Sequence, residues 1–307
     1  MTAKLTIGTR GSPLARAQSD DVARRLKIAR PELAEPGALD IIVISTTGDQ
    51  ILDRPLAEIG GKGLFTKEIE EALADRRIDL AVHSMKDVET VLPEGLAIAA
   101  ILPREDPRDV LIANDVLRVA DLPQGARVGT ASLRRRAQLL SLRPDLDVTP
   151  FRGNVDTRLR KLADGEVDAT ILALAGLRRL GRDGYEERTI AVEDMLPAVA
   201  QGAVGIECRE GDEDTWPLVK SLEDLSSARE VACERALLAA LDGSCRTPIA
   251  GLARISGDRL ELRALIATPD GATLHHAERA GSATEAEALG RDAGEELRAA
   301  GGPGFFA

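Results

Sequence analysis

Three stretches of the chain repeat one order of residues: a short apolar run, a turn with hydroxyl and arginine side chains, and a helix-like run. They occupy residues 4–15, 128–136 and 148–158. A strand that enters a helix through such a turn is the building unit of α/β proteins with parallel strands. In open α/β sheets, ligands bind beyond the carboxyl ends of the strands. The pattern therefore predicts α/β domains in which strand-end arginines meet a ligand.

The first of these turns has the residues of a helix start and of an anion site. Ser12 stands at the expected N-cap and Pro13 at the first helical position, which are the places these residues favour. Arg10 adds a cation beside the free N–H groups of the helix start. Backbone N–H groups at a helix N-terminus bind anions. The turn thus predicts contact with an anionic ligand, and a plain strand-to-helix turn remains the alternative.

The second turn brings cations to the positive end of a helix. Ser132 is followed by Arg134, Arg135 and Arg136. Each cation there is unfavourable by about 0.3–1 kcal/mol. An anionic ligand would remove the conflict, whereas a solvated basic helix face is the alternative.

Arginine recurs at two further strand ends. Arg152 and Arg158 flank Gly153 and Asn154, and Arg179 follows the strand expected at 168–173. The chain has 33 arginines and seven lysines, a bias that codon usage alone would spread without regard to strand ends. The positions therefore favour guanidinium groups that bind carboxylate or phosphate in a bidentate manner.

Polar residues also follow the apolar run 79–82. His83, Ser84, Lys86 and Asp87 come directly after it. A carboxylate beside an ammonium group at a strand end is a candidate for acid–base or charge-stabilising chemistry. From spacing alone, a polar turn with a local Lys86–Asp87 contact is the favoured interpretation.

A long polar segment, 48–63, precedes this run and contains Lys62 between glycines. A loop of this length is usually functional or disordered. We expect it to be mobile and to carry Lys62 over a binding site.

Composition excludes several classes of protein. The net charge is −11 and only six residues are aromatic, which opposes a nucleic-acid binder. No apolar run approaches the length of a membrane-spanning helix, and the N-terminus lacks the apolar region of a signal peptide. We expect a cytoplasmic monomer without a membrane partner.

The three cysteines indicate a reducing compartment. Their number is odd and no C-x-x-C pair occurs, so neither a disulfide framework nor a metal site is predicted. Cys208 and Cys233 stand in apolar runs typical of inert core thiols. Cys245 stands in a turn with glycine, serine, arginine and proline, a setting that suits a reactive thiol. No histidine neighbours it, so a covalent attachment point is favoured over a protease-like nucleophile.

The chain order predicts three domains. The proline-rich segment 103–109 crosses from the first to the second domain, and the apolar run 199–209 returns as a second hinge strand. A helix at 226–241, three alternating strands and a final helix at 284–299 form a small α+β domain. The expected boundaries are 1–102 plus 198–218, then 103–197, then 219–307.

Eight stretches together resemble the porphobilinogen deaminase, or hydroxymethylbilane synthase, family. They are residues 9–15, 60–65, 81–87, 104–109, 129–135, 152–155, 201–207 and 243–245. Each motif is weak by itself, but all eight in this order are specific and run nearly end to end.

The resemblance implies a fold and an activity. The fold would have two periplasmic-binding-protein-like (type II) α/β domains joined by hinge strands, plus a small C-terminal α+β domain. The enzyme would be a transferase of tetrapyrrole and heme biosynthesis. It would join four porphobilinogen molecules head to tail, with loss of ammonia, onto a dipyrromethane cofactor linked to Cys245 through a thioether. Hydrolysis would then release hydroxymethylbilane, and no metal is implied.

The resemblance also assigns roles to residues. Asp87 matches the catalytic aspartate, which assists deamination and stabilises the cationic azafulvene. Cofactor contacts would come from Cys245, Lys86, Asp87, Ser132, Arg134 and Arg135. Substrate contacts would come from Arg10, Ser12, Gln18, Lys62, Arg152, Arg158, Arg179 and Arg209.

Three features depart from the family pattern. Ala131 replaces a frequent serine, Asp156 adds an anion near the arginines, and the tail 301–307 is unusual. The principal rival interpretation is a small-anion binding protein with the same two-lobed architecture and no chemistry. Such a protein would have no use for the Cys245 turn.

Overall fold

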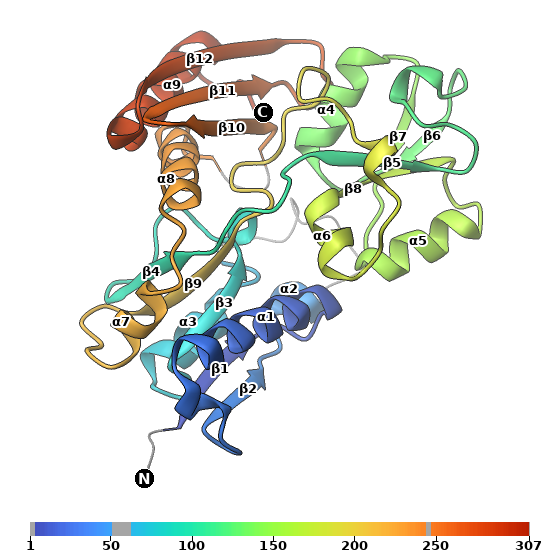
Figure 1. The fold of residues 1–307 in the computed structure, drawn as a ribbon. Coiled ribbons are helices and arrows are strands. Elements are labelled where there is room, and N and C mark those ends of the chain that lie inside the picture. The colour runs from blue at the N-terminus through green and yellow to red at the C-terminus, as the bar shows by residue number, and fades with distance from the viewer. Residues whose placement is uncertain (1–3, 51–62, 244–246, 307) are drawn as a thin grey trace. The chain divides into compact units, whose positions relative to one another are not determined.

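The computed structural model describes residues 4–50, 63–243 and 247–306 (Figure 1). Their contacts divide into two compact units. Unit 1 holds the described residues of 4–50, 63–105 and 203–228, and unit 2 holds 106–202, 229–243 and 247–306. The chain therefore leaves unit 1 after Glu105 and re-enters it at Ala203.

Unit 1 is built on a mixed five-stranded sheet with the order β2-β1-β3-β9-β4. Strands β2, β1 and β3 are parallel, and β9 is antiparallel to both β3 and β4. The strands are β1 (Leu5–Thr9), β2 (Leu39–Val43), β3 (Leu80–Ser84), β4 (Leu96–Ile101) and β9 (Val204–Arg209). The helices are α1 (Pro13–Ala29), α2 (Thr47–Gln50), α3 (Lys67–Ala74) and α7 (Thr215–Lys220), with 3₁₀ turns at Pro31–Ala34 and Met85–Asp87.

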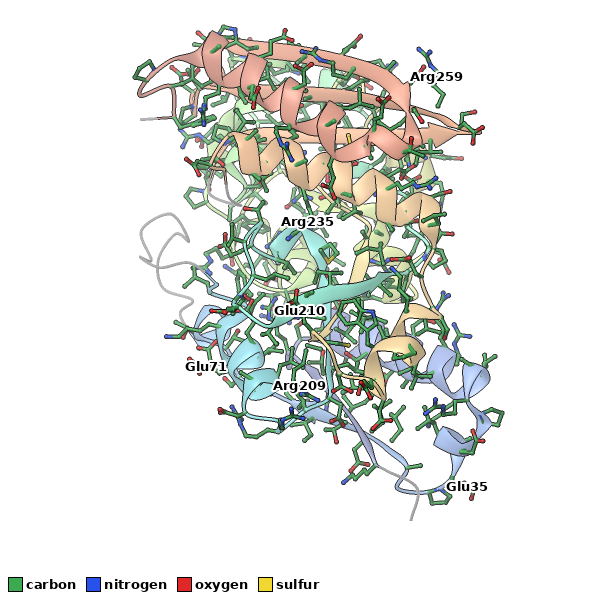
Figure 2. All side chains as sticks on the ribbon, turned by 90° about the vertical axis from the view of Figure 1, so that its left-hand side faces the viewer. Glu35, Glu71, Arg209, Glu210, Arg235 and Arg259 are labelled. Carbon is green, nitrogen blue, oxygen red and sulfur yellow. The ribbon has the colours of Figure 1, made fainter. Side chains whose placement is uncertain are left out.

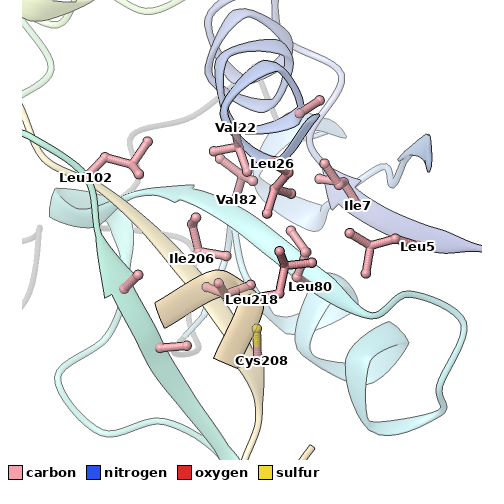
Figure 3. Close-up of a cluster of buried hydrophobic side chains, with 14 of the residues drawn as sticks. Leu5, Ile7, Val22, Leu26, Leu80, Val82, Leu102, Ile206, Cys208 and Leu218 are labelled. Atoms are coloured by element: carbon pink, nitrogen blue, oxygen red, sulfur yellow. The ribbon is translucent and has the colours of Figure 1, made fainter. Parts of the chain in front are cut away.

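Alternate residues of β3 serve the two faces of this sheet. Leu80 and Val82 join the core that includes Val22 and Leu26 of α1 (Figure 3). Ala81 belongs to a second core with Ile69, Ala72 and Leu73 of α3. Successive strand side chains point to opposite faces, so His83 shares the α3 side with Ala81.

Unit 2 contains a four-stranded sheet with the order β5-β8-β6-β7. Strand β6 is parallel to β7 and β8, whereas β5 is antiparallel to β8. The elements are β5 (Asp109–Ala113), β6 (Arg127–Gly129), α4 (Leu133–Leu142), β7 (Asp147–Thr149), α5 (Val155–Ala163), β8 (Ala169–Ala173) and α6 (Leu174–Arg179), with 3₁₀ turns at Val119–Asp121 and Glu186–Arg188.

The C-terminal part of unit 2 has an antiparallel three-stranded sheet with the order β10-β11-β12. Its elements are α8 (Leu225–Ala240, which starts in unit 1), β10 (Ile249–Ser256), β11 (Arg259–Ala267), β12 (Leu274–Ser282), a 3₁₀ turn at Ala283–Glu285 and α9 (Ala286–Gly301). A core formed with Ala137 of α4 and with Leu196 joins this sheet to the preceding one. Among the described residues, no helix is long and apolar enough to cross a membrane.

The outer edge of β10 is covered by acceptors from other elements. The N–H of Gly251 donates to the Pro197 carbonyl at 3.1 Å. The next two outward N–H groups donate to carboxylates of α8: Ala253 to Glu234 at 2.8 Å and Ile255 to Glu230 at 3.0 Å. These three outward amides are thus satisfied, so this part of the strand edge is covered.

Most elements predicted from the sequence are confirmed. The strand expected at 79–82 is β3, the helix that starts at Pro13 is α1, and the C-terminal strands and helix are β10, β11, β12 and α9. Gly181 follows α6 with a φ of +64°, the left-handed conformation in which glycine commonly ends a helix.

Two strand boundaries differ from those that the sequence pattern predicts. The apolar pattern at 40–47 predicts a strand, but β2 ends at Val43, and Thr47 starts α2 with its N–H and hydroxyl bonded to Glu68. The strand expected from 199 starts at Val204. Residues before it form a turn with positive φ at Ala200 and Gly202, a conformation that a strand cannot contain.

The C-terminal tail packs against the end of α9. The Phe305 ring lies 5.2 Å from the His275 ring of β12 and 5.4 Å from the Phe306 ring. A Cβ at Gly301 would come within 2.9 Å of the Phe305 ring. The unusual tail sequence therefore continues the packing of the final helix.

Candidate active site

The candidate catalytic residue Asp87 lies in a 3₁₀ turn that is seated on β9. The N–H of Met85 donates to the Ala203 carbonyl at 3.1 Å. The Met85 side chain is buried over Gly205, where an added Cβ would lie 2.1 Å from its sulfur. The turn therefore rests on β9 while Lys86 and Asp87 stay half-buried, as groups that meet a ligand must.

The strand end before this turn is held on α1. Gln18 is buried, and its Nε2 donates to Ser84 Oγ at 2.9 Å. The Ser84 hydroxyl also lies 3.1 Å from Gln18 Oε1, to which it can donate. The structure thus places Gln18, a predicted substrate contact, against the residue that ends β3.

The first strand-end turn has the local geometry expected for it. Ser12 is the N-cap of α1, and its hydroxyl accepts from the Ala15 N–H at 3.2 Å. The Arg10 guanidinium lies 4.1 Å from the centre of the Phe65 ring, a cation–π geometry. This contact of Phe65 was not predicted. The sequence feature that could have indicated it is a single aromatic residue directly after a glycine-rich segment.

A buried imidazole–carboxylate pair lies directly before the Asp87 turn. His83 Nε2 of β3 is 2.8 Å from Glu207 Oε2 of β9, and the two side chains are 4% and 0% exposed. In the register of the two strands, Glu207 is opposite Ala81 and His83 is opposite Gly205, so the pair is diagonal on the α3 face. The sequence analysis counted His83 among the polar residues of this turn but missed Glu207.

In unit 2, a single carboxylate holds both predicted cofactor-binding arginines. Arg134 Nη2 donates to Asp109 Oδ2 at 2.8 Å, and Arg135 Nη2 donates to Asp109 Oδ1 at 2.8 Å. Their Nη1 groups donate to main-chain carbonyls at 2.6 and 2.9 Å. Ser132 caps α4 by accepting from the Arg135 N–H at 3.4 Å. The conflict expected at this helix start is therefore relieved by Asp109, a residue of the chain itself.

This cluster is deeply buried and strongly charged. Burial alone would raise the pKa of Asp109, but the charges and hydrogen bonds of Arg134 and Arg135 outweigh it and hold that pKa well below its usual value. The two arginines are 4% and 5% exposed, so a solvated basic face is wrong for them and holds for exposed Arg136. Among the described residues, the Nε–H groups of Arg134 and Arg135 have no acceptor.

The remaining predicted arginines of unit 2 are half-buried at strand or helix ends. Arg158 Nε donates to the Gly153 carbonyl at 2.9 Å, next to the α5 N-cap Asn154. Arg179 Nη2 donates to the Gly202 carbonyl at 2.7 Å. Arg152 is also half-buried. All three residues are therefore partly exposed.

Asp156, one of the departures from the family pattern, has a partner of its own. Its Oδ1 accepts from Arg182 Nη2 at 2.5 Å, and both side chains are about half exposed. The extra anion is therefore balanced on the surface of α5.

Arg209, which is labelled in Figure 2, is opposite Leu96 of β4 and follows Cys208, the partner of Leu80 at the start of β3. Its Nη1 donates to the carbonyls of Leu73 and Ile78 at 2.9 and 2.7 Å, and its Nη2 donates to Asp212 at 2.8 Å. Because the Arg209 side chain contacts Ile78 and Asp79, which precede β3, and Asp87 follows the end of β3, the structure does not bring Arg209 and Asp87 together.

Two predicted site residues, Lys62 and Cys245, lie outside the described residues. Cys208 and Cys233 are buried free thiols, and burial raises the pKa of each to about 12. Both thiols are therefore inert at neutral pH. Within 4–50, 63–243 and 247–306, no cluster of three or more His, Cys, Asp or Glu could hold a metal.

Comparison with protein families decides the affiliation. The model described as "Porphobilinogen deaminase, dipyromethane cofactor binding domain" matches residues 5–216, and "Porphobilinogen deaminase, C-terminal domain" matches residues 228–299. The chain belongs to the porphobilinogen deaminase family.

Curated members of the porphobilinogen deaminase family are similar along nearly the whole chain. The porphobilinogen deaminase of Paracoccus denitrificans is 54% identical over 302 residues, which cover 98% of this chain and 96% of the relative. The chloroplastic porphobilinogen deaminase of Oryza sativa subsp. japonica is 53% identical over 305 residues, 98% of this chain and 85% of the relative.

Solved structures also align with the chain at low identity. A periplasmic substrate-binding protein of an ABC transporter from Coxiella burnetii is 17% identical with a TM-score of 0.44. The alignment covers 74% of this chain and 96% of the Coxiella chain. The aliphatic sulphonate binding protein SsuA from Escherichia coli is 16% identical with a TM-score of 0.42, covering 78% and 71%.

Proposed function

We propose that this chain is a porphobilinogen deaminase that joins four porphobilinogen molecules head to tail and releases hydroxymethylbilane. The observation that carries the proposal is the 53–54% identity with curated porphobilinogen deaminases over at least 98% of the chain. The half-buried Lys86–Asp87 turn and the strand-end arginines are the kinds of group that this chemistry requires.

The residues of unit 2 fit a dipyrromethane cofactor, whose two pyrrole rings each carry two carboxylates. The buried Nε–H groups of Arg134 and Arg135 have no acceptor among the described residues. A buried donor without an acceptor costs about 1–3 kcal/mol, and a carboxylate ligand would remove that cost. We assign the carboxylate contacts of the cofactor to these arginines with Ser132 and Lys86, and its thioether attachment to Cys245.

The chemistry requires one carboxylate beside a developing cation. Loss of ammonia from porphobilinogen breaks the C–N bond, and the electron pair leaves with nitrogen, so the substrate becomes a cationic azafulvene. When bound, dipyrromethane supplies the pyrrole α-carbon that forms the new C–C bond and loses its proton, which ammonia can carry away as ammonium. Asp87 stabilises the cation and binds pyrrole N–H groups, because a fixed charge placed where charge develops lowers the barrier.

The other cations bind the substrate carboxylates. We assign this role to Arg10, Ser12, Arg152, Arg158 and Arg179, with Lys62 as a further contact. Gln18 and Arg209 remain predicted contacts from the family pattern, although both side chains bond mainly to the protein itself. The three domains, 1–102 plus 198–218, 103–197 and 219–307, the monomeric state and the cytoplasmic location are parts of the same proposal.

Intact-mass measurement of the purified protein and of Cys245→Ser tests the proposal. We expect an added mass of two linked pyrrole units on the wild type and the bare chain for the variant. If the wild type also has the mass of the bare chain, incubation with porphobilinogen decides. Gain of the adduct and release of hydroxymethylbilane support the enzyme, whereas binding without mass gain or product supports a non-enzymatic anion-binding protein.

A further inference from the structure

The pair formed by His83 and Glu207 is costly for the stability of unit 1. Glu207 is 0% exposed, and only its Oε2 has a partner; Oε1 has no donor among the described residues. Burying an ionised carboxylate with incomplete hydrogen bonding is expensive. Buried pairs can often be replaced by apolar residues of similar volume without loss of stability. Stability alone therefore does not account for this pair.

The other charged groups near the pair are also acidic. Glu70 of α3 is 9% exposed; its pKa is raised above its ordinary value by burial first, with Glu207 and Glu89 adding to the rise while Thr66 and His83 oppose it. Glu89, which follows the Asp87 turn, accepts from the Gly63 N–H at 3.3 Å. Glu70 thus interacts with both members of the pair and with Glu89.

The position of the pair relates it to Asp87. His83 is the last fully buried residue of β3 before the strand end and the 3₁₀ turn. Two further contacts join this region to β9: the Met85 N–H bonds to Ala203, and the Met85 side chain covers Gly205. The His83–Glu207 hydrogen bond adds a side-chain link on the α3 face of the same two strands.

We propose that the hydrogen bond between His83 and Glu207 positions the turn that carries Lys86 and Asp87 for the deaminase reaction. The role rests on the proposed function. His83 and Glu207 are positioning residues that act through the turn and do not touch the substrate. A side-chain displacement of 1 Å at a reacting centre can lower the rate about a hundredfold. The buried hydrogen bond prevents such a displacement of the turn.

Two conservative variants of Glu207 test whether the reaction depends on the hydrogen bond or on the negative charge of the side chain. Glu207→Gln keeps the length of the side chain and an acceptor for His83 Nε2 but removes the charge. Glu207→Asp keeps the charge but withdraws the acceptor by one methylene group. We expect kcat within about threefold of wild type for Glu207→Gln and at least tenfold lower for Glu207→Asp, with KM for porphobilinogen within threefold in both.

The control is Glu234→Gln. Glu234 is also 0% exposed, but its two oxygens accept from the N–H groups of Ala200 and Ala253 in unit 2. Glutamine can replace only one of these acceptors, so we expect a lower Tm with kcat unchanged. The control shows whether loss of a buried carboxylate changes turnover merely by loosening the fold.

A second variant keeps the test decisive if Glu207→Asp unfolds. The double substitution His83→Leu with Glu207→Met replaces the pair by apolar groups, and we expect its Tm to be retained and its kcat to fall at least tenfold. The role is overturned if the aspartate variant is as active as the glutamine variant, or if the double variant turns over like the wild type. A wild type that forms no hydroxymethylbilane overturns the proposed function, and this role with it.

Discussion

Each unit of the molecule buries one carboxylate against basic side chains, but the two are satisfied to different degrees. In unit 2, both oxygens of Asp109 accept hydrogen bonds, from Arg134, Arg135 and Gln201. In unit 1, Glu207 accepts one bond, from His83, and its second oxygen has no donor among the described residues. Both oxygens of Asp109 are therefore paired, although the Nε–H groups of Arg134 and Arg135 have no acceptor among the described residues, whereas only one oxygen of Glu207 is paired.

The difference indicates what each buried charge contributes. A buried carboxylate with both oxygens paired rigidifies its surroundings and is costly to remove. A half-satisfied one adds little stability and persists where position matters. We therefore expect changes at Asp109 to act on folding, and changes around Glu207 to act on turnover.

The largest effect is expected at the turn that Glu207 supports. Asp87→Ala should lower kcat by about 10³-fold, in the range typical of lost acid–base or electrostatic catalysis. The side chain is half-buried and the turn is held by Met85, so Tm should stay the same. Steady-state rates and a melting curve test both parts, and a variant with wild-type rates would remove Asp87 from the mechanism.

Asp109→Asn should have the largest effect on stability. Removing one partner of a buried charge cluster costs about 3–5 kcal/mol, because two guanidinium groups lose their counter-charge. Urea unfolding, followed by hydrogen exchange of the amides in β5 and α4, measures this loss in the free energy of unfolding. Glu207→Gln is the matched change in unit 1, and an equal loss of stability there would erase the distinction between the two clusters.

Glu70→Gln should change how stability depends on pH. Burial raises the pKa of Glu70 in the folded protein above 4.5. Such a group contributes stability that is complete below its unfolded pKa and is lost as the pH rises through its folded pKa. Glutamine does not titrate, so the variant should gain Tm relative to wild type between pH 5 and pH 8. A difference in Tm that is constant over this range would contradict the prediction.

Asp156→Ala should have the smallest effect. Its pair with Arg182 is about half exposed, and such surface pairs contribute about 0–1 kcal/mol. We expect Tm to fall by no more than about 2 °C and KM for porphobilinogen to stay within twofold. A large drop in KM would mean that this departure from the family pattern weakens substrate binding after all.

Local rules explain which features the sequence analysis predicted. The predicted N-cap Ser12 accepts a bond from an N–H three residues ahead, so neighbouring residues determine it. Apolar runs of four to eight residues likewise located β3 and the C-terminal strands. The predicted strand ends were less accurate, because they depend on backbone geometry. Ala200 has a positive φ, and nothing about an alanine in the sequence indicates it.

Pairings between distant residues could not be predicted. Asp109 and Arg134 are 25 residues apart, Gln18 and Ser84 are 66 apart, and His83 and Glu207 are 124 apart. Their contacts depend on the order of strands in the sheets, which spacing does not determine. A weak signal was present, since Asp109 and Glu207 are charges inside otherwise apolar runs and so needed buried partners.

The carboxylates that cover the edge of β10 have a consequence during synthesis. An open strand edge invites pairing with another chain and hence aggregation. Helix α8 precedes β10 in the sequence, so Glu230 and Glu234 leave the ribosome before the amides of Ala253 and Ile255 that they cover. The carboxylates can thus cover the edge of β10 as the sheet forms. Neighbouring nascent chains on one messenger RNA then cannot pair through this edge.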